Sequence, residues 1–88
     1  MNLAKSLAGH DRNHYYAVIR EEEENVYLAN GTTKPCEHPK KKRRKHIQII
    51  KRLPEEVSAL LKEAAGTDDR VLASAIKMYE QYLKREKD

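Results

Sequence analysis

The chain has 88 residues, enough for one small domain, and it contains neither Phe nor Trp, so its core must be thin. Its 18 Lys and Arg residues outnumber its 14 Asp and Glu residues, which gives a formal net charge of +4. No apolar run approaches the roughly 18 residues that span a membrane, and the first residues lack the apolar centre of a secretory signal. A single cysteine, Cys36, cannot form an internal disulfide, which favours a reducing, cytoplasmic location.

Short segments rich in aliphatic, β-branched and aromatic residues predict four or five strands in the first part of the chain. The expected strands are Leu3–Leu7, Tyr15–Ile19, Val26–Ala29 and His46–Ile50, with a short or edge strand beginning at Thr32. The strand from Thr32 is expected because it follows Asn30-Gly31, which is the strongest short hairpin signal in the sequence.

Two polar segments separate the first three expected strands. Gly9 precedes His10 to Asn13, and both Gly and Asn tolerate a positive φ, so this segment predicts a turn. Glu21 to Glu24 are four consecutive carboxylates, which favours a solvated hairpin turn. A cation site is disfavoured there, because consecutive side chains of an extended chain point to alternate sides.

The second part of the chain has the pattern of two helices. Pro54 suits the first turn of a helix, and apolar residues then recur at Val57, Leu60, Leu61 and Ala64. Gly66 is the expected left-handed end of this helix, Thr67 the expected N-cap of the next, and the second helix should cover residues 68–85. The sequence therefore predicts an α+β chain with a strand-rich segment, 1–52, and a helical hairpin, 53–88.

The most unusual stretch is Lys40 to Lys45, six consecutive cations between Pro39 and His46. Residues 1–52 hold 12 Lys and Arg against 6 Asp and Glu, whereas residues 53–88 lean acidic. Six like charges in a row repel one another, so a dense, extended anion such as a nucleic-acid backbone is the expected partner. The alternatives are a solvated basic loop and a nuclear import signal. We expect a basic loop that leads into the last strand.

The order of these features resembles a KOW-type domain over roughly residues 1–50. The resemblance depends on Lys5 to Arg12, Tyr16 to Val18, Val26 to Gly31, Pro39 to Lys42 and Lys45-His46. Proteins of this type include large-subunit ribosomal proteins of the archaeal and eukaryotic kind and their bacterial relatives. The resemblance implies a small SH3-like β-barrel whose loops bind structured RNA, above all ribosomal RNA, without enzymatic activity. It does not cover residues 53–88, for which we expect either a cover over an open barrel edge or a docking surface for neighbouring ribosomal proteins.

The candidate RNA-binding residues combine the glycine-containing turn with the basic segment. Gly9 would let the backbone approach a phosphate, and a guanidinium such as that of Arg12 can fork two hydrogen bonds to phosphate oxygens. The set is Lys5, Gly9, His10, Arg12, Asn13, Lys34, Lys40, Lys41, Lys42, Arg43, Arg44, Lys45 and His46. One of Tyr15 and Tyr16 should also face outward, where it could stack on an unpaired base.

Other site chemistries have weaker support. Cys36, His38 and His46 lack the ligand spacing of a zinc site and have no second cysteine, so no metal is expected. No nucleophile-elbow or phosphate-loop pattern surrounds the polar residues, so no catalytic residue and no cofactor are expected.

A DNA-binding alternative uses the second part of the chain. Residues 46–85, a strand followed by two helices, resemble a ribbon-helix-helix unit, which dimerises through its strand and reads duplex DNA from it. This interpretation would leave residues 1–45 without a role.

Overall fold

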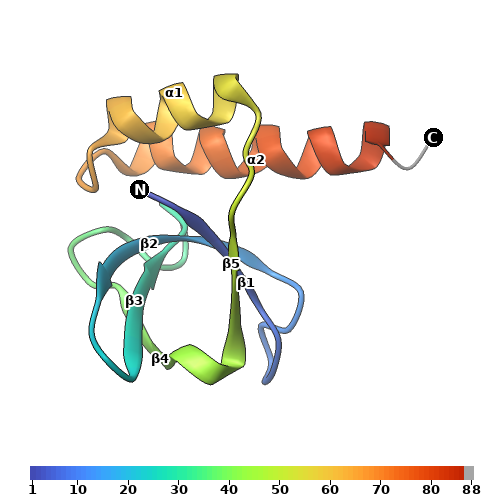
Figure 1. The fold of residues 1–88 in the computed structure, drawn as a ribbon. Helices are drawn as coiled ribbons and strands as arrows, with labels where there is room; N and C mark the ends of the chain where they lie inside the picture. Colours follow the sequence, from blue (N-terminus) through green and yellow to red (C-terminus); the bar gives the residue numbers. More distant parts are fainter. Residues whose placement is uncertain (87–88) are drawn as a thin grey trace.

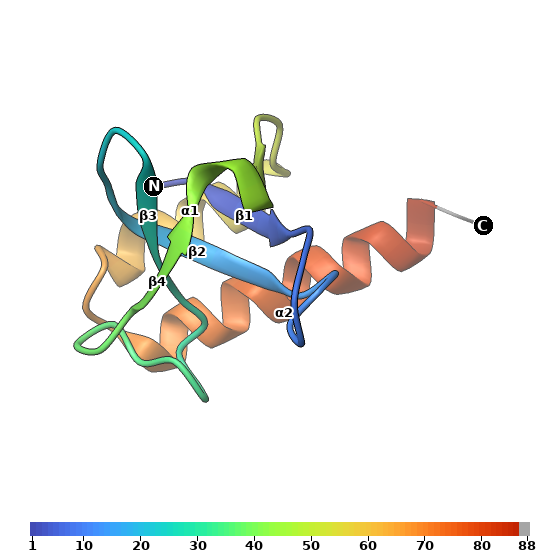
Figure 2. The same cartoon turned by 90° about the horizontal axis from the view of Figure 1, so that it is seen from below.

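A computed structural model describes residues 1–86, which form a five-stranded sheet and two α-helices, so the α+β class predicted from the sequence is confirmed. The sheet is open and antiparallel, with the order β4-β3-β2-β1-β5. The strands are β1 (Leu3–Ser6), β2 (Tyr15–Glu21), β3 (Asn25–Ala29), β4 (Lys40–Arg43) and β5 (Ile47–Ile50). A 3-10 turn, η1 (Arg44–His46), joins the two edge strands on the side away from the helices (Figures 1 and 2).

Both faces of the sheet are apolar, which explains why the Tyr15–Ile19 segment shows no alternation between apolar and polar residues. Successive side chains of a strand point to opposite faces. The face away from the helices carries one buried cluster, made of Ala4, Tyr16, Val18, Val26, Leu28 and Ile47. The other face contributes Leu3, Ala17 and Ala29 to a second cluster that it shares with the helices.

A β-bulge in β2 changes which side chains reach solvent. Val18 pairs with Leu28, but the next pair is Arg20 with Tyr27, so Ile19 is the extra residue. Because one residue is inserted, the alternation shifts by one position after Val18. Val18 therefore remains in the buried cluster, while Arg20 lies on the surface beside Tyr27.

The first helix, α1 (Glu55–Ala64), begins directly after Pro54 and buries Val57, Leu61 and Ala64. Glu55 and Glu56 lie in its first turn, where carboxylates favour the positive end of the helix dipole. Gly66 has a φ of 74°, which confirms its predicted left-handed conformation, and Ala65 before it is left-handed as well.

The second helix, α2 (Asp69–Glu86), occupies the predicted place, but its predicted N-cap is wrong. Asp68 caps the helix, because its carboxylate oxygen Oδ1 accepts a hydrogen bond of 3.2 Å from the backbone N–H of Val71. The Thr67 hydroxyl instead donates to the carbonyl of Ala64 at the end of α1. An Asp one residue further along therefore displaces Thr67 from this role.

The predicted hairpin at Asn30-Gly31, with a return strand from Thr32, is also wrong. The side-chain oxygen of Asn30 accepts hydrogen bonds from the backbone N–H groups of Thr32 and Lys34, both at 2.9 Å. These bonds fold the chain into a compact local turn, an alternative that Asn side chains offer to strand pairing. The chain then runs on as a loop and returns to pair with β3 only at Lys40.

This loop is docked on the beginning of α2. A methyl group at Gly31 would clash with the backbone carbonyl of Asp69, so the glycine allows the loop to touch the helix backbone. Nearby, the backbone N–H of Cys36 donates a 2.7 Å hydrogen bond to the Asp69 carboxylate. Burial, together with the side-chain hydrogen bond between the thiol and the Asp69 carboxylate, raises the pKa of the Cys36 thiol to about 11, so the thiol stays protonated at neutral pH.

The strand-rich segment 1–52 and the described part of the helical segment 53–88 share one core. Leu3, Ala17 and Ala29 of the sheet are fully buried together with Leu61 and Leu72 of the helices. The helices thus cover one face of the sheet (Figure 1). Residues 87 and 88 of the predicted hairpin lie outside the described residues.

The two helical tyrosines are packing residues, as predicted. Tyr79 is buried, and its ring meets Tyr15 edge-to-face with centroids 5.3 Å apart. Tyr82 stacks on Tyr79 at 6.1 Å.

Candidate nucleic-acid interface

The basic segment is not the loop that the sequence predicts: Lys40–Arg43 form strand β4, and Arg44–His46 form the 3-10 turn η1. The strand pairs residue by residue with β3, from Leu28 opposite Lys40 to Asn25 opposite Arg43. Lysine is common on edge strands because its charge prevents pairing with other chains. A strand also sends neighbouring cations to opposite faces, which relieves their repulsion.

The alternation divides the four cations of β4 into two pairs. Lys40 and Lys42 turn toward the interior and bind Asp11, whereas Lys41 and Arg43 are exposed. The ammonium of Lys42 donates three hydrogen bonds, to Asp11 Oδ1 and Ser6 Oγ at 2.7 Å and to the carbonyl of Ala8 at 2.8 Å. An ammonium has three donors, so Lys42 has none left for a phosphate. Lys42, which the sequence predicts as an RNA-binding residue, therefore has a structural role instead.

Asp11 is the centre of this buried polar cluster. Its carboxylate accepts hydrogen bonds from Ser6 Oγ at 2.8 Å, Tyr16 OH at 3.0 Å and Lys40 Nζ at 2.9 Å, besides the one from Lys42. Burial alone would raise the pKa of Asp11, but these four donors outweigh it and hold the pKa well below its usual range. The same burial, with the bond to Asp11, raises the pKa of Tyr16 to about 12.

The Asp11 cluster fixes the glycine-containing turn against the basic strand. Gly9 and Asn13 have φ values of 88° and 72°, as their residue types predict. Backbone hydrogen bonds close the turn from Arg12 to Gly9 and from Asn13 to Ser6. The side chains of His10, Arg12 and Asn13 are exposed. The turn and β4, more than 25 residues apart in sequence, are thus brought together by the two lysine contacts to Asp11.

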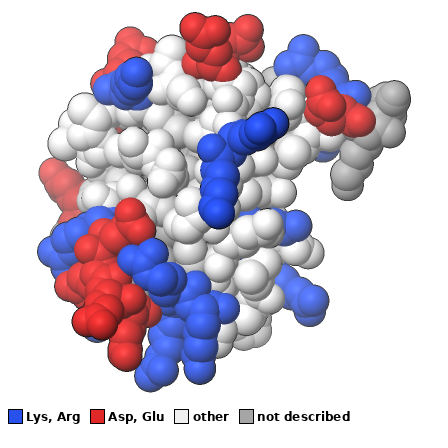
Figure 3. All heavy atoms as spheres, in the orientation of Figure 1, with Lys and Arg blue, Asp and Glu red and all other residues white. Residues whose placement is uncertain are grey.

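Arg44 is tied to the acidic turn that joins β2 and β3. Its guanidinium donates to Glu21 Oε1 at 2.9 Å and to the backbone carbonyls of Glu22 at 2.7 Å and Glu23 at 3.3 Å. Its backbone N–H donates to the carbonyl of Glu24. Arg44 is therefore partly neutralised, and the acidic turn is held beside the basic surface, as Figure 3 shows at the lower end of the molecule.

The remaining cations of the segment face solvent. Lys41, Arg43 and Lys45 are exposed, and none of them forms an ion pair within residues 1–86. The His46 side chain is exposed beside them, and its carbonyl accepts a hydrogen bond from Leu7. These side chains form one basic surface across β4 and η1.

Two predicted site residues lie elsewhere. Lys5 alternates with Ser6 on β1 and therefore points to the face of the sheet that the helices cover. Lys34 belongs to the loop docked on α2, where its backbone bonds to Asn30 close the turn. The structure therefore separates both from the β4–η1 surface.

Neither of the tyrosines predicted for base stacking is available for it. Tyr16 is buried and bound to Asp11, and Tyr15, on the opposite face, packs against Tyr79 of α2. The outward face that the alternation predicts for one of them exists, but the helices cover it. The predicted RNA-binding set includes neither Asp11 nor Tyr27, yet the structure places both beside the basic strand. Asp11 binds Lys40 and Lys42, and Tyr27 pairs with Lys41. No local pattern singles out either residue.

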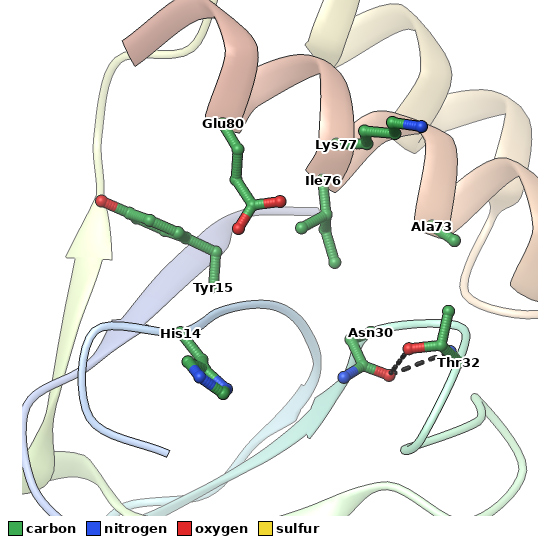
Figure 4. Close-up of a pocket in the computed structure, with 8 residues that line it drawn as sticks. All are labelled: His14, Tyr15, Asn30, Thr32, Ala73, Ile76, Lys77 and Glu80. Atoms are coloured by element: carbon green, nitrogen blue, oxygen red, sulfur yellow. Dashed lines mark hydrogen bonds between the residues drawn. The ribbon is translucent and has the colours of Figure 1, made fainter. Parts of the chain in front are cut away.

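A separate groove lies between the sheet and α2, with a volume of about 480 Å³. Glu80 and Ile76 reach into it from α2, opposite Tyr15 and the loop that carries Asn30 and Thr32 (Figure 4). The Asn30 oxygen is already used within its own loop.

Within residues 1–86, no group of three or more His, Cys, Asp or Glu side chains is arranged to hold a metal ion. No helix in this part of the chain has the length and apolar character needed to cross a membrane. No protein-family model and no curated protein sequence matches the chain.

Proposed function

We propose that this chain is a non-enzymatic RNA-binding protein of the KOW type that binds structured ribosomal RNA through the β4–η1 surface and the Gly9–Asn13 turn. The observation that carries the proposal is the set of three exposed cations, Lys41, Arg43 and Lys45, that form no ion pair within residues 1–86. They lie on β4 and η1, and the other face of β4 is tied to the Gly9–Asn13 turn through Asp11. The resemblance of residues 1–50 to KOW-type domains of ribosomal proteins also implies a ribosome-associated, cytoplasmic role.

The strand arrangement supports the SH3-like part of this proposal. Five antiparallel strands in the order β4-β3-β2-β1-β5, with a 3-10 turn between the two edge strands, are compatible with a small barrel that closes through η1. The hydrogen bond from Leu7 to the carbonyl of His46 links the end of β1 to that turn. The apolar cluster of Tyr16, Val18 and Leu28 would fill the barrel interior.

The mechanism is electrostatic attraction combined with recognition of shape. Exposed cations bind phosphates and position the protein without reading sequence. Structured RNA is recognised mostly by shape, and that requires a rigid binding surface. The Asp11 cluster would provide this rigidity, because it fixes the Gly9–Asn13 turn to the basic strand.

The ribbon-helix-helix alternative receives no support from the residues it needs. Its strand, β5, pairs with β1 over four residues, and Ile47 is buried within the chain's own core. A strand engaged in this way presents little of its surface to a DNA groove. We therefore do not carry DNA binding forward as a second function.

The test is binding of the full-length chain to fluorescently labelled ribosomal RNA fragments, with duplex DNA of equal length as the comparison. We expect RNA to bind more tightly, and the protein to sediment with ribosomal particles at low salt. With Arg12, Lys41, Arg43 and Lys45 as the phosphate contacts, the slope of log affinity against log salt should be roughly −3 for single-stranded RNA. A salt-independent affinity, or equal binding of RNA and DNA, would contradict the proposal.

A further inference from the structure

A row of three side chains crosses the sheet from β2 to β4 on its outer face, which is the face opposite the buried cluster of Tyr16 and Leu28. Arg20 pairs with Tyr27, and Tyr27 pairs with Lys41, so an aromatic ring lies between two cations. The guanidinium of Arg20 lies 4.1 Å from the centre of the Tyr27 ring. This row exists only because the bulge at Ile19 brings Arg20 to the outer face.

The Tyr27 ring borders a surface pocket of about 440 Å³. Ile19, Tyr27 and Pro39 supply apolar walls, and the polar groups of Arg20, Glu37 and His38 complete the lining. Aromatic and apolar walls with a few polar groups are typical of sites for small planar ligands. Lys41 and Arg43, exposed on the same face of β4, extend the site toward the basic surface.

Tyr27 is not needed to fill a core. It is only partly buried and belongs to neither of the two buried apolar clusters. Its hydroxyl donates a 3.2 Å hydrogen bond to Glu22, and the Arg20 guanidinium lies over one face of the ring. The ring is thus held in one orientation before any ligand arrives, which lowers the cost of ordering it on binding.

We propose that this pocket binds one unpaired nucleotide of RNA, with its base against the Tyr27 ring and the adjoining phosphates on Lys41 and Arg43. Unpaired bases stack on aromatic rings and on guanidinium planes, and here Tyr27 and Arg20 provide both. The inference depends on the proposed RNA-binding function and adds a single-stranded feature to the RNA that the protein selects. It gives Tyr27 the stacking role for which Tyr15 and Tyr16 are unavailable.

The direct test uses tryptophan fluorescence, because the natural chain contains no Trp. A Tyr27→Trp variant would carry one fluorophore in the pocket, and a Tyr82→Trp variant would carry one on α2 as the matched control. A short unstructured oligoribonucleotide should quench the fluorescence of the first variant and leave the second unchanged. Binding is followed in parallel by anisotropy with a labelled copy of the same oligonucleotide.

Affinity measurements on Tyr27 variants provide the second test. Loss of one base–aromatic stack in Tyr27→Leu should weaken binding of the unstructured RNA roughly 5- to 150-fold. Tyr27→Phe keeps the ring and should bind nearly as well as the natural chain. A fully paired RNA hairpin with a minimal loop should be affected much less by Tyr27→Leu. If Tyr27→Leu does not fold, the comparison of Tyr27→Trp with Tyr27→Phe remains.

The outcomes separate this inference from the proposed function. One outcome keeps the function and overturns the nucleotide pocket. In it, the combined variant Lys41→Ala and Arg43→Ala weakens RNA binding, whereas Tyr27→Leu binds RNA as tightly as the natural chain and the fluorescence of Tyr27→Trp is not quenched. If the natural chain binds no RNA, both are overturned. Quenching in Tyr27→Trp with weaker binding in Tyr27→Leu establishes the pocket.

Discussion

The ammonium of Lys42 lies 2.7 Å from a carboxylate oxygen of Asp11, and the two side chains are only 9% and 10% exposed. A cation from the most basic segment of the chain is therefore held inside the protein. A buried ion pair of this kind stabilises a fold only while both partners and their other hydrogen bonds remain in place. The contact defines the geometry of the proposed RNA-binding surface, and several predictions depend on it.

Replacing Asp11 with Asn should destabilise the protein by about 3–5 kcal/mol, because Lys42 would remain buried without a counter-charge. The change keeps the shape of the side chain, so the loss reports charge and not packing. Urea unfolding at neutral pH measures it. Glu23→Gln, at an exposed carboxylate, is the matched control and should change the stability by no more than about 0.5 kcal/mol. Equal effects of the two substitutions would show that the Asp11 charge does not matter.

The stability should fall at acidic pH because of Asp11. Its pKa in the folded state lies below the ordinary value of 3.8, so the unfolded chain takes up the proton first as the pH decreases. The contribution of this carboxylate is complete well above pH 3.8 and is lost as the pH falls through that value toward the folded-state pKa. Unfolding free energies at a series of acidic pH values should decline less steeply in Asp11→Asn than in the natural chain.

The same substitution at two neighbouring lysines of β4 should change the stability by very different amounts. Lys42→Met leaves Asp11 without the more buried of its two cationic partners and should cost several kcal/mol, on the order of 3. Lys41→Met alters an exposed side chain and should change the stability by less than about 0.5 kcal/mol. Thermal unfolding of the two variants measures the difference. Similar melting temperatures would mean that the alternation of β4 does not divide its cations into structural and exposed pairs.

Lys41 and Arg43, the exposed pair of β4, should account for about half of the salt dependence of RNA binding. Replacing both Lys41 and Arg43 with Ala should reduce the magnitude of the log–log salt slope by roughly 1.4 for single-stranded RNA, about 0.7 for each phosphate contact. Replacing Arg70 and Lys77, two exposed cations of α2, removes the same charge at a different place and should leave the slope unchanged. Anisotropy titrations at several salt concentrations measure both slopes. Equal reductions would indicate attraction by net charge alone.

Two glycines with similar backbone angles provide a matched pair for the docking of α2. Gly31→Ala and Gly9→Ala both place a methyl group on a left-handed residue, a cost of about 1–3 kcal/mol. Only at Gly31 would the methyl group also clash with the backbone of Asp69; at Gly9 the nearest atom is 3.6 Å away. Gly31→Ala should therefore lower the stability more, and hydrogen exchange should show α2 opening in that variant. Equal losses would mean that the loop and helix can separate without cost.

The elements with strong local signals were predictable from the sequence. The strands at Leu3, Tyr15 and Val26, the turn at Gly9 and Asn13, and both helices depend on residue preferences that act over a few neighbours. The N-cap of α2 and the return strand after Asn30 were not, because side-chain hydrogen bonds of Asp68 and Asn30 competed with the expected structure.

The sequence by itself determined that the chain is basic, that its cations are concentrated in one segment, and that strands precede helices. Tertiary structure alone decided which cations reach solvent. Pairing of β4 with β3 makes the segment a strand, and the buried carboxylate of Asp11, distant in sequence, retains Lys40 and Lys42. The physical reason is that burial and charge pairing depend on partners far along the chain. Lys41 and Lys42, neighbours with identical side chains, differ only in the face of the strand from which they project.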